Sequence, residues 1–382
     1  MKLSHGLHLA YCTNIHRGQS WPETADALKQ YTLAVRDRVS PKSAYAIGLR
    51  LSDQASRELS EPQQLLTFQK WLDRENCYVF TINGFPYGQF HGTRVKEQVY
   101  APDWMAPERL AYTCRLFDIL EKLLPPGIEG SVSTVPCSYK EFIRSPDQEK
   151  AMRQNLWRCV EHIAGKSLHL GLEPEPLCYL ETSQETVDFL DRMRADRTGN
   201  DRLDRHLGVN YDTCHLAVEF EEPADVLRRF KDHNVRISKL HLSSALKVHS
   251  DRATRQALRA FADETYFHQV IERGADGALK RYKDLDVALA TSGHNATEWR
   301  IHFHVPLHSP ATKLFGNTAD HLLGVLDALQ QDPNLCSHLE METYTWEVMP
   351  PEMKNRDVVD QLAGEYDWAL KHLAERGFTR AQ

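Results

Sequence analysis

Short hydrophobic runs alternate along the chain with longer segments in which apolar positions recur at helical spacing. Short apolar runs bounded by polar and turn-forming residues are typical of buried strands, and the periodic segments are typical of amphipathic helices. The alternation predicts βα units on a parallel sheet. The predicted strands are Leu7–Asn14, Tyr45–Leu51, Cys77–Asn83, Gly130–Val135, Leu168–Glu173, His206–Asp212, Arg236–Leu242 and His338–Tyr344.

A helix is predicted after each strand. The first helix begins after Ser20, because Ser20 as N-cap, Pro22 in the first turn and Glu23 three residues after the cap form a capping box. Eight strands that each lead to a helix predict an α/β fold, a (β/α)8 TIM barrel that occupies 1–382 as one domain. The other predicted helices cover about residues 61–75, 107–124, 148–164, 184–194, 223–233 and 357–376.

The regular alternation breaks between the seventh and the last predicted strands. Two further β-like runs lie in this interval, Tyr266–Glu272 and Trp299–Val305. The first run and the turn-forming residues 274–277 predict a β-hairpin inserted after strand seven, within an insertion of about 245–310. The second run either extends the loop after strand seven or adds a strand beside it.

The composition is typical of a soluble globular protein, with 41% hydrophobic and 26% charged residues. The formal net charge of −7 gives no overall positive field for a nucleic acid or an anionic membrane. His5 and His8 interrupt the N-terminal segment where a signal peptide requires an apolar stretch. Eight scattered cysteines form no Cys-x-x-Cys pair, which excludes a zinc ribbon. We therefore expect a cytoplasmic protein with neither nucleic acid nor membrane as partner.

Acidic residues and histidines stand at the carboxyl ends of the later predicted strands, where barrel enzymes carry their active sites. A capping or salt-bridged carboxylate and a hydrogen-bonded core histidine are the structural alternatives at each position. Ligands of both types on four successive strands instead predict a divalent metal site for Zn²⁺, Mn²⁺, Co²⁺, Fe²⁺ or Mg²⁺. The residues concerned are Glu173, Asp212, His215, His241, Glu340 and Glu342.

Two pairs of residues require a choice. Glu340 and Glu342 share a face of the last strand, and Glu342 is the predicted ligand because it lies nearer the strand end. His302 and His304 share a face of the additional run, and His304 is the preferred site residue. Buried, inert thiols are expected for the cysteines beside the site.

The order Glu, Asp-x-x-His, His and Glu on successive strands resembles the xylose-isomerase-like barrels. These include metal-dependent sugar isomerases and epimerases and, in another branch, zinc phosphodiesterases that cut DNA at abasic sites. Over nearly the whole chain the sequence is more specifically similar to the EboE metabolite traffic proteins. That similarity rests on residues 11–16 (Tyr-Cys-Thr-Asn-Ile-His), 81–88 (Thr-Ile-Asn-Gly-Phe-Pro-Tyr-Gly), 91–96 (His-Gly-Thr-Arg-Val-Lys) and 342–346 (Glu-Thr-Tyr-Thr-Trp). The family is associated with moving or maturing a secondary metabolite, and the resemblance supplies no reaction.

The resemblance to isomerases and epimerases implies a metal on Glu173, Asp212, His241 and Glu342, with His215 facing the substrate or joining the ligands. It also implies that Glu173 and Glu342 act as the acid/base pair while bound to metal. The phosphodiesterase branch carries an Asp-x-His pair after strand seven, and this sequence has His302-x-His304 there. The number of ions therefore stays open between one and two. The full predicted ligand set is Glu173, Asp212, His215, His241, His304 and Glu342.

The loop over residues 83–96 offers an amide, aromatic rings and basic side chains that can clamp hydroxyl groups or a phosphate. A solvated turn is the alternative. Tyr87 and Trp346 either stack on the apolar face of a ring or simply pack. The expected substrate-binding residues are His16, Asn83, Tyr87, His91, Arg94, Lys96, Glu175, His215 and Trp346.

The leading hypothesis is a metal-dependent isomerase or epimerase of a polyhydroxylated, sugar-like small molecule in a pathway of secondary-metabolite traffic or maturation. A carboxylate would remove a proton beside a metal-polarised carbonyl group and return it. The first alternative is a non-catalytic metabolite-binding or carrier protein, because a fold does not prove chemistry. The second is an endonuclease IV-like zinc phosphodiesterase with Arg50, Arg94 and Lys96 in a groove; the net charge of −7 disfavours it.

Overall fold

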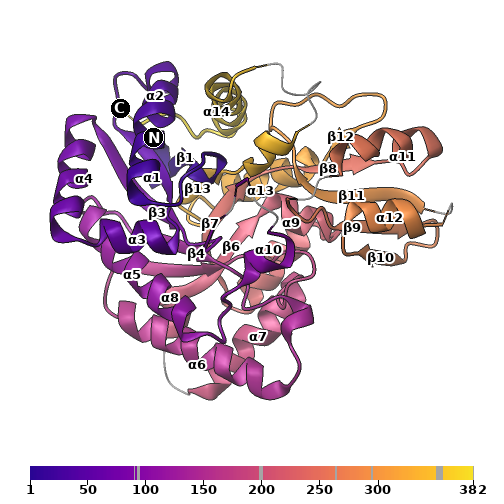
Figure 1. The fold of residues 1–382 in the computed structure, drawn as a ribbon, viewed down its shortest axis with the longest axis horizontal. Helices are drawn as coiled ribbons and strands as arrows, with labels where there is room; N and C mark the ends of the chain where they lie inside the picture. Colours follow the sequence, from indigo (N-terminus) through magenta and orange to yellow (C-terminus); the bar gives the residue numbers. More distant parts are fainter. Residues whose placement is uncertain are drawn as a thin grey trace.

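The computed structural model describes residues 1–89, 91–92, 95–197, 201–262, 265–293, 296–349 and 356–381. Its main sheet has eight parallel strands in the order β1-β13-β7-β6-β5-β4-β3-β2 (Figure 1). A parallel bridge between Cys12 and Gly48 links the two ends of this sheet, so that it nearly closes into a barrel. The strands are β1 (His8–Tyr11), β2 (Tyr45–Arg50), β3 (Cys77–Asn83), β4 (Gly130–Thr134), β5 (Leu168–Leu172), β6 (Leu207–Asp212), β7 (Arg236–Leu242) and β13 (His338–Met341).

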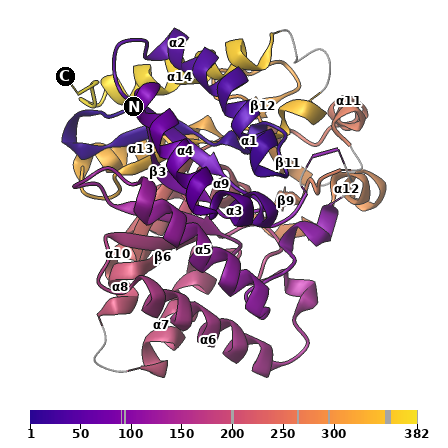
Figure 2. The same cartoon turned by 60° about the vertical axis from the view of Figure 1, so that its left-hand side comes forward.

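Helices cover the outside of the barrel, as Figures 1 and 2 show from two directions. The capping box predicted at Ser20 is present, since the backbone N–H of Glu23 donates to Ser20 Oγ and Ser20 N–H donates to Glu23 Oε2. The helices are α1 (Trp21–Ala27), α2 (Leu33–Val39), α3 (Asp53–Leu59), α4 (Pro62–Arg74), α5 (Pro107–Leu123), α6 (Pro146–Ile163), α7 (Ser183–Asp196), α8 (Arg202–His206), α9 (Thr213–Val218), α10 (Pro223–Asp232), α13 (Ala319–Gln331) and α14 (Val358–Ala374).

The predicted (β/α)8 barrel is confirmed, but its first and last strands are shorter than expected. β1 ends at Tyr11 and β13 ends at Met341, and each is followed by a short 3-10 helix, Thr13–Ile15 and Tyr344–Val348. The two segments that follow these paired strands are linked by a hydrogen bond, in which Asn14 Nδ2 donates to Glu342 Oε1 at 2.8 Å.

A second sheet lies beside the barrel and is inserted between β7 and β13 (Figure 1). It is antiparallel, with the strand order β10-β9-β11-β8-β12. The β-like run predicted at Trp299–Val305 forms the central strand of this sheet, and the predicted hairpin turns at Gly274–Gly277, where Gly277 has a φ of +82°. The elements are β8 (Ala245–Val248), α11 (Arg252–Leu258), β9 (Val270–Gly274), β10 (Leu279–Tyr282), α12 (Leu285–Thr291), β11 (Ala296–His304) and β12 (Gly316–Asn317).

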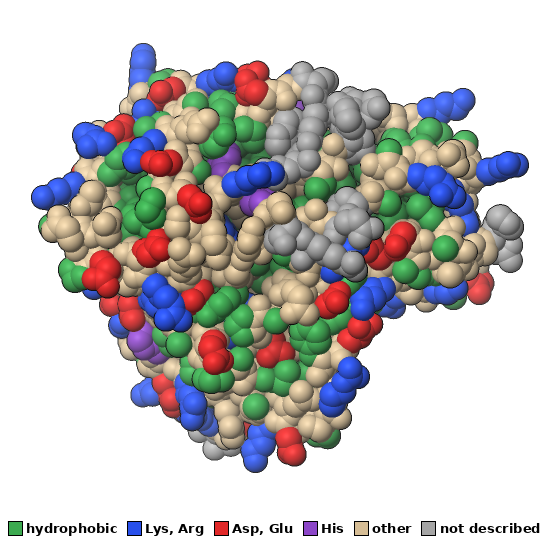
Figure 3. Space-filling model, in the orientation of Figure 1, with side chains coloured by type: hydrophobic (Ala, Val, Ile, Leu, Met, Phe, Trp, Pro, Cys, Tyr) green, Lys and Arg blue, Asp and Glu red, His purple; other side chains and the backbone are tan. Residues whose placement is uncertain are grey.

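Two properties of the described residues bear on partners. No helix among them is both long enough and apolar enough to cross a membrane. On the face shown in Figure 3, basic and acidic side chains are interspersed, without a continuous basic stripe of the kind that follows a nucleic acid backbone.

Three buried histidines cluster at the amino-terminal ends of the barrel strands. His8 begins β1, His338 begins β13 and His169 is the second residue of β5; the ring centroids of His169 and His338 are 5.2 Å apart. Burial lowers the pKa of all three, that of His8 to about 4 with help from the N-terminal amino group. Neither ring nitrogen of His169 makes a hydrogen bond to a described residue. These histidines are therefore neutral in the folded protein and take up protons on unfolding.

We expect the free energy of unfolding to fall as the pH is lowered from about 6.5, where an unfolded histidine begins to bind a proton, towards 4. His169→Phe should reduce that loss by about 2 kcal/mol between pH 7 and pH 5, since each proton bound only by the unfolded chain contributes about 1.4 kcal/mol per pH unit. Urea unfolding at several pH values measures this. The exposed control His249→Phe should leave the pH dependence unchanged, and an equal effect of both substitutions would contradict the prediction.

Candidate metal centre

Four side chains from successive strand ends converge at the carboxyl end of the barrel. Glu173 follows β5, Asp212 ends β6, His241 lies in β7 and Glu342 follows β13, and each offers one ligand atom within 4.8 Å of the others. His241 Nδ1 lies 2.9 Å from Glu173 Oε1, 3.4 Å from Asp212 Oδ2 and 3.3 Å from Glu342 Oε2. All four are buried. The structure thus brings together the four residues that the strand pattern singled out.

In Asp212 and Glu173, one carboxylate oxygen is engaged by neighbouring side chains or backbone and the other oxygen is left without a hydrogen-bond donor among the described residues. Asp212 Oδ1 accepts hydrogen bonds from Cys214 N–H at 2.7 Å and from Ser243 Oγ at 2.5 Å, which caps α9. Asp212 Oδ2 and Glu173 Oε2 have no hydrogen-bond partner among the described residues. A buried carboxylate oxygen without a donor is costly unless a cation compensates it. The donor set therefore fits a divalent ion.

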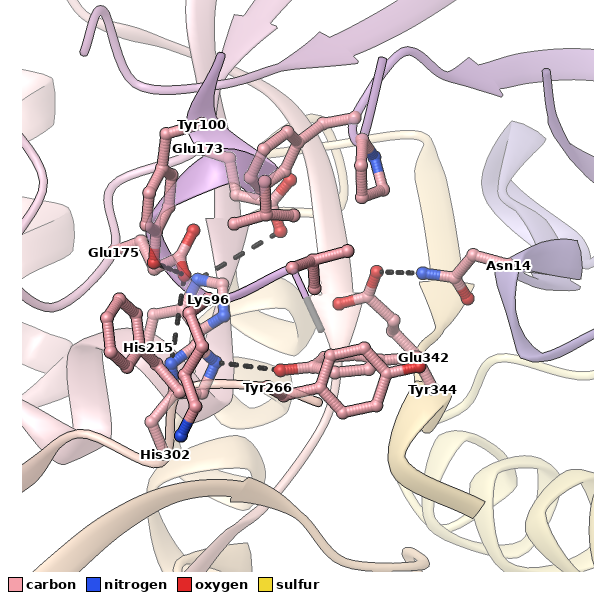
Figure 4. A pocket seen from close by; sticks show the side chains of 15 residues that line it. Asn14, Lys96, Tyr100, Glu173, Glu175, His215, Tyr266, His302, Glu342 and Tyr344 are labelled. Atoms are coloured by element: carbon pink, nitrogen blue, oxygen red, sulfur yellow. Dashed lines mark hydrogen bonds and ion pairs between the residues drawn. The ribbon is translucent and has the colours of Figure 1, made fainter. Parts of the chain in front are cut away.

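Glu342 is oriented by two amides. Its Oε1 accepts a hydrogen bond from Asn14 Nδ2 at 2.8 Å (Figure 4) and another from Asn83 Nδ2 at 3.3 Å. Its Oε2 is left facing His241 Nδ1. Asn83 ends β3 and Asn14 lies after β1, the strand that pairs with β13, so two barrel strands without a candidate ligand orient this carboxylate.

His241 is held from behind by a buried ion pair. Its Nε2 lies 2.8 Å from Glu340 Oε2, and Lys239 Nζ lies 2.6 Å from the same oxygen. Burial alone would raise the pKa of Glu340, but Lys239 and His241 outweigh it and lower this pKa to about 2. The ionised carboxylate accepts the Nε2 proton, so that Nδ1 is the His241 nitrogen that faces the three carboxylates. This is the arrangement of a metal-binding histidine.

The charge balance at this point favours a cation. Burial lowers the pKa of His241, but the negative charges of Glu342 and Glu173 exceed that effect and raise it well above the ordinary value. For Asp212, burial is likewise outweighed by His215, His304 and His241, which hold its pKa well below the usual range. A site that draws a proton onto Nδ1 this strongly also draws a metal ion.

A second group of histidines adjoins the first. Asp212, His215 and His304 form one set of ligand atoms within 4.8 Å of each other, and Cys214, His302 and His304 form another. His215 Nδ1 lies 3.1 Å from the carbonyl oxygen of Pro174, and His304 Nδ1 lies 2.9 Å from that of Glu342. A carbonyl oxygen only accepts, so both Nδ1 atoms carry protons and both Nε2 atoms present lone pairs.

These two Nε2 atoms face each other at 3.4 Å. Burial lowers the pKa of His215 to about 4, so its ring is neutral at physiological pH. Two lone pairs at this distance repel unless a proton or a metal ion lies between them. The histidine group therefore offers nitrogen donors to a second ion.

The metal centre borders a small pocket (Figure 4). Carboxyl groups and histidines form its inner wall, and aromatic rings form much of the remainder. Glu175 lies in this wall, where Tyr100 Oη donates to its Oε1 at 2.8 Å and its Oε2 has no hydrogen-bond partner among the described residues. Burial, with the nearby charges of Glu173 and Glu342, raises the pKa of Glu175 well above its usual range. The lining aromatic residues are Phe85, Tyr100, Tyr266, Phe267 and Tyr344.

The predicted substrate-binding residues occupy three different settings. Glu175, His215 and Lys96 line the cavity, and Lys96 Nζ forms a buried ion pair with Asp284 at 2.5 Å. Four others are not among the lining residues. Of these, His16 forms a hydrogen bond with Tyr11 Oη and Asn83 forms one with Glu342. The ring of Tyr87 packs edge to face on Tyr112. His91 forms hydrogen bonds with Tyr266 Oη and with the carbonyl group of Asn14. Arg94 and the side chain of Trp346 lie outside the described residues.

Sequence reasoning missed most of the aromatic wall. Tyr100 lies in a 3-10 helix (Lys96–Tyr100), and Phe267 lies in the segment before β9. Tyr100 belongs to no predicted strand or helix, and Phe267 lies in the β-like run predicted at Tyr266–Glu272, which was assigned to a hairpin and not to the site. The one available signal was the density of aromatic residues in the loops over the carboxyl ends of the strands.

Comparison with solved structures shows that the fold is that of xylose-isomerase-like TIM barrels. A xylose isomerase-like TIM barrel protein from Mycobacterium smegmatis in complex with magnesium gives a TM-score of 0.55 at 13% identity, covering 98% of this chain and 99% of that one. L-ribulose 3-epimerase gives 0.52 at 12% over 99% and 96%, and the IolI protein with a bound zinc atom gives 0.51 at 11% over 96% and 98%. No protein-family profile and no curated protein sequence matches the chain, so the similarity to EboE proteins is not confirmed.

The support behind His241 depends on the absence of a side chain at one position of β2. A Cβ atom on Gly48 would overlap Glu340 Oε1 and lie 2.7 Å from the carbonyl oxygen of Tyr11. Gly48→Ala should therefore displace Glu340, release His241 and weaken metal binding about 10- to 100-fold. Competition titration with a chelator measures this affinity.

Gly208→Ala is the matched control, because its Cβ would overlap the carbonyl oxygen of Arg236. Both residues lie at the amino-terminal ends of their strands, β6 and β7, away from the metal centre. Both variants should lower the melting temperature, and Gly48→Ala alone should lose metal affinity. Equal metal affinity in the two variants would contradict this role of Gly48.

Proposed function

We propose that the protein is a metal-dependent isomerase or epimerase of a polyhydroxylated small molecule. The observation that carries this proposal is the convergence of three carboxylates on Nδ1 of His241 beside a pocket. The similar solved structures support sugar chemistry, since they include L-ribulose 3-epimerase and a D-allulose 3-epimerase from Methylomonas sp. in complex with D-allulose. The similarity to EboE proteins supports a place in secondary-metabolite traffic or maturation, with partners encoded in the same pathway.

The proposed chemistry is a proton transfer at a carbon atom beside a carbonyl group. A divalent ion bound by Glu173, Asp212, His241 and Glu342 supplies Lewis-acid polarisation of that carbonyl group. Glu173 and Glu342 both line the cavity from different strands, so one carboxylate can remove a proton and the other can return it. Asn14 and Asn83 hold Glu342 in position, and the apolar lining keeps water from the reacting carbon atom.

We also propose a second ion on the histidine group. His215 and His304 supply facing nitrogen donors, and the free Oδ2 of Asp212 lies 3.7 Å from His215 Nε2. Nitrogen-rich ligands favour Zn²⁺, Co²⁺ or Fe²⁺ over Mg²⁺. The carboxylate-rich first set accepts either kind of ion.

The enzyme hypothesis is tested by hydrogen exchange. Protein loaded with Mn²⁺, Co²⁺ or Mg²⁺ is incubated in D₂O with a panel of ketoses and cyclic polyol ketones, and NMR follows deuterium at the carbon atoms beside the carbonyl group. Glu342→Gln should reduce exchange by about 100-fold or more while the protein still folds. The exposed control Glu121→Gln should retain full exchange. Metal and ligand binding without any exchange would favour the carrier alternative instead.

The number of ions is tested by metal analysis. After dialysis against zinc and removal of free ions, the wild-type protein should hold two zinc ions per chain. His304→Gln should hold one, since it removes the nitrogen donor that faces His215. A single ion in both proteins would contradict the second site and leave the first intact.

A further inference from the structure

We infer that Cys114 and Cys159 form a dithiol that a hydroperoxide oxidises to a disulfide, and that this disulfide joins α5 to α6 and restrains the loop before α5. Cys114 lies in α5 and Cys159 lies in α6, and these two helices pack side by side on the outside of the barrel (Figure 2). Neither cysteine belongs to the groups of candidate metal ligands or lines the pocket beside them. The inference is therefore independent of the proposed function.

Two side-chain contacts between α5 and α6 fix the register of the helix pair. His162 Nε2 lies 2.7 Å from Asp118 Oδ1, and Lys166 Nζ donates to Glu121 Oε2 at 2.7 Å. The helices run in the same direction, because each of them leads from one parallel strand of the barrel to the next. The residues that face each other one turn earlier can therefore be read from the sequence of each helix.

Cys114 and Cys159 are the residues that meet at this level. Cys114 precedes Asp118 by four residues, so both lie on the side of α5 that faces α6. Cys159 precedes His162 by three residues and lies on the facing side of α6 for the same reason. The two thiol groups form a hydrogen bond with each other, and both cysteines are reduced in this structure. Because the thiol groups already meet, an S–S bond between them requires no large movement of the backbone.

The two thiols differ in exposure and in acidity. Cys114 is half-buried, whereas Cys159 is fully buried. The hydrogen bond with Cys159 lowers the pKa of Cys114 despite its partial burial, and the nearby basic groups of His162 and Lys166 add to this effect. The same hydrogen bond, together with burial, raises the pKa of Cys159 well above its ordinary value. An accessible, acidic thiol reacts first with a hydroperoxide, so Cys114 is the attacking group and Cys159 resolves the product.

The oxidation transfers one electron pair from the two thiols to the hydroperoxide. The Cys114 thiolate attacks one peroxide oxygen and the O–O bond breaks, which leaves Cys114 as a sulfenic acid. The other oxygen departs as hydroxide or alkoxide and takes up the proton that the Cys114 thiol released. Cys159 Sγ then attacks Cys114 Sγ, so that the S–S bond forms, the S–O bond breaks and the hydroxyl group leaves with the Cys159 proton as water. An external dithiol reverses the reaction by exchange and is itself oxidised.

The same two helices hold the loop that carries part of the pocket wall. In α5, Arg109 Nε donates to the carbonyl group of Pro102 at 2.7 Å. In α6, Asn155 Nδ2 donates to the carbonyl group of Trp104 at 2.9 Å. Tyr100, which lines the pocket, lies immediately before these anchor points. A covalent link between the helices therefore restrains the support of this segment and reduces its local opening.

The test starts from the reduced full-length protein, which is treated with a small excess of hydrogen peroxide. Mass spectrometry of the intact chain and of its peptides should show a disulfide between Cys114 and Cys159, with the loss of both thiol hydrogens, and dithiothreitol should reverse it. The control Cys77→Ala removes the most exposed of the other cysteines and should form the same disulfide. Free thiols at Cys114 and Cys159 after treatment, or a disulfide between other cysteines in their place, would overturn the inference.

Two further measurements assign the roles of the two thiols and the effect on the loop. Peroxide-treated Cys159→Ala should accumulate a sulfenic acid at Cys114, which dimedone traps, whereas Cys114→Ala should leave Cys159 unmodified. Amide hydrogen exchange at residues 99–105 should be about threefold slower or more in the oxidised wild-type protein than in the reduced one, and peroxide should cause no such change in Cys159→Ala. Trapping at Cys159 would overturn the assigned order of attack, and equal exchange in both redox states would overturn the effect on the loop.

Discussion

The concentration of negative charge around Nδ1 of His241 is the constraint on which the rest of the site depends. Three buried carboxylates can lie this close only if positive charge stands between them, and the ion pair of Glu340 and Lys239 behind the imidazole sets which of its nitrogens faces them. The surrounding hydrogen bonds from Asn14, Ser243 and the start of α9 fix the acids without neutralising them. The arrangement of acids that suits an ion therefore lowers the stability of the metal-free protein, as is common at functional sites.

The barrel and the main part of this centre were predictable because their signals are periodic. In a parallel barrel the strand ends meet at one rim, so residues far apart in sequence such as Glu173 and Asp212 could be placed together from the strand pattern alone. The two-residue repeat placed Glu340 and Glu342 on one face of the last strand, and the position nearer the strand end selected Glu342. The actual end of that strand at Met341 was not predictable, since the residues up to Tyr344 continue the strand pattern and the chain instead leads into a 3-10 helix at Tyr344–Val348.

The cavity wall was not predictable for a related reason. Phe85, Tyr100 and Phe267 come from three irregular segments, and their meeting point depends on how the inserted sheet packs on the barrel. Lys96 illustrates the difficulty, because its sequence suggested a phosphate contact and only the packed structure reveals Asp284 as its partner. Irregular segments carry no repeat from which such partners can be read.

The inserted sheet has a consequence for how this protein can diverge. It enters the chain between β7 and β13 and supplies His302, His304, Gln269 and Phe267, while the acidic ligands come from the barrel. One contiguous stretch of the gene thus brings two histidines and part of the pocket wall to the mouth of a barrel that supplies the carboxylates. Replacement of that stretch alone would alter the histidine group and the pocket wall and leave the three carboxylates around Nδ1 of His241 in place.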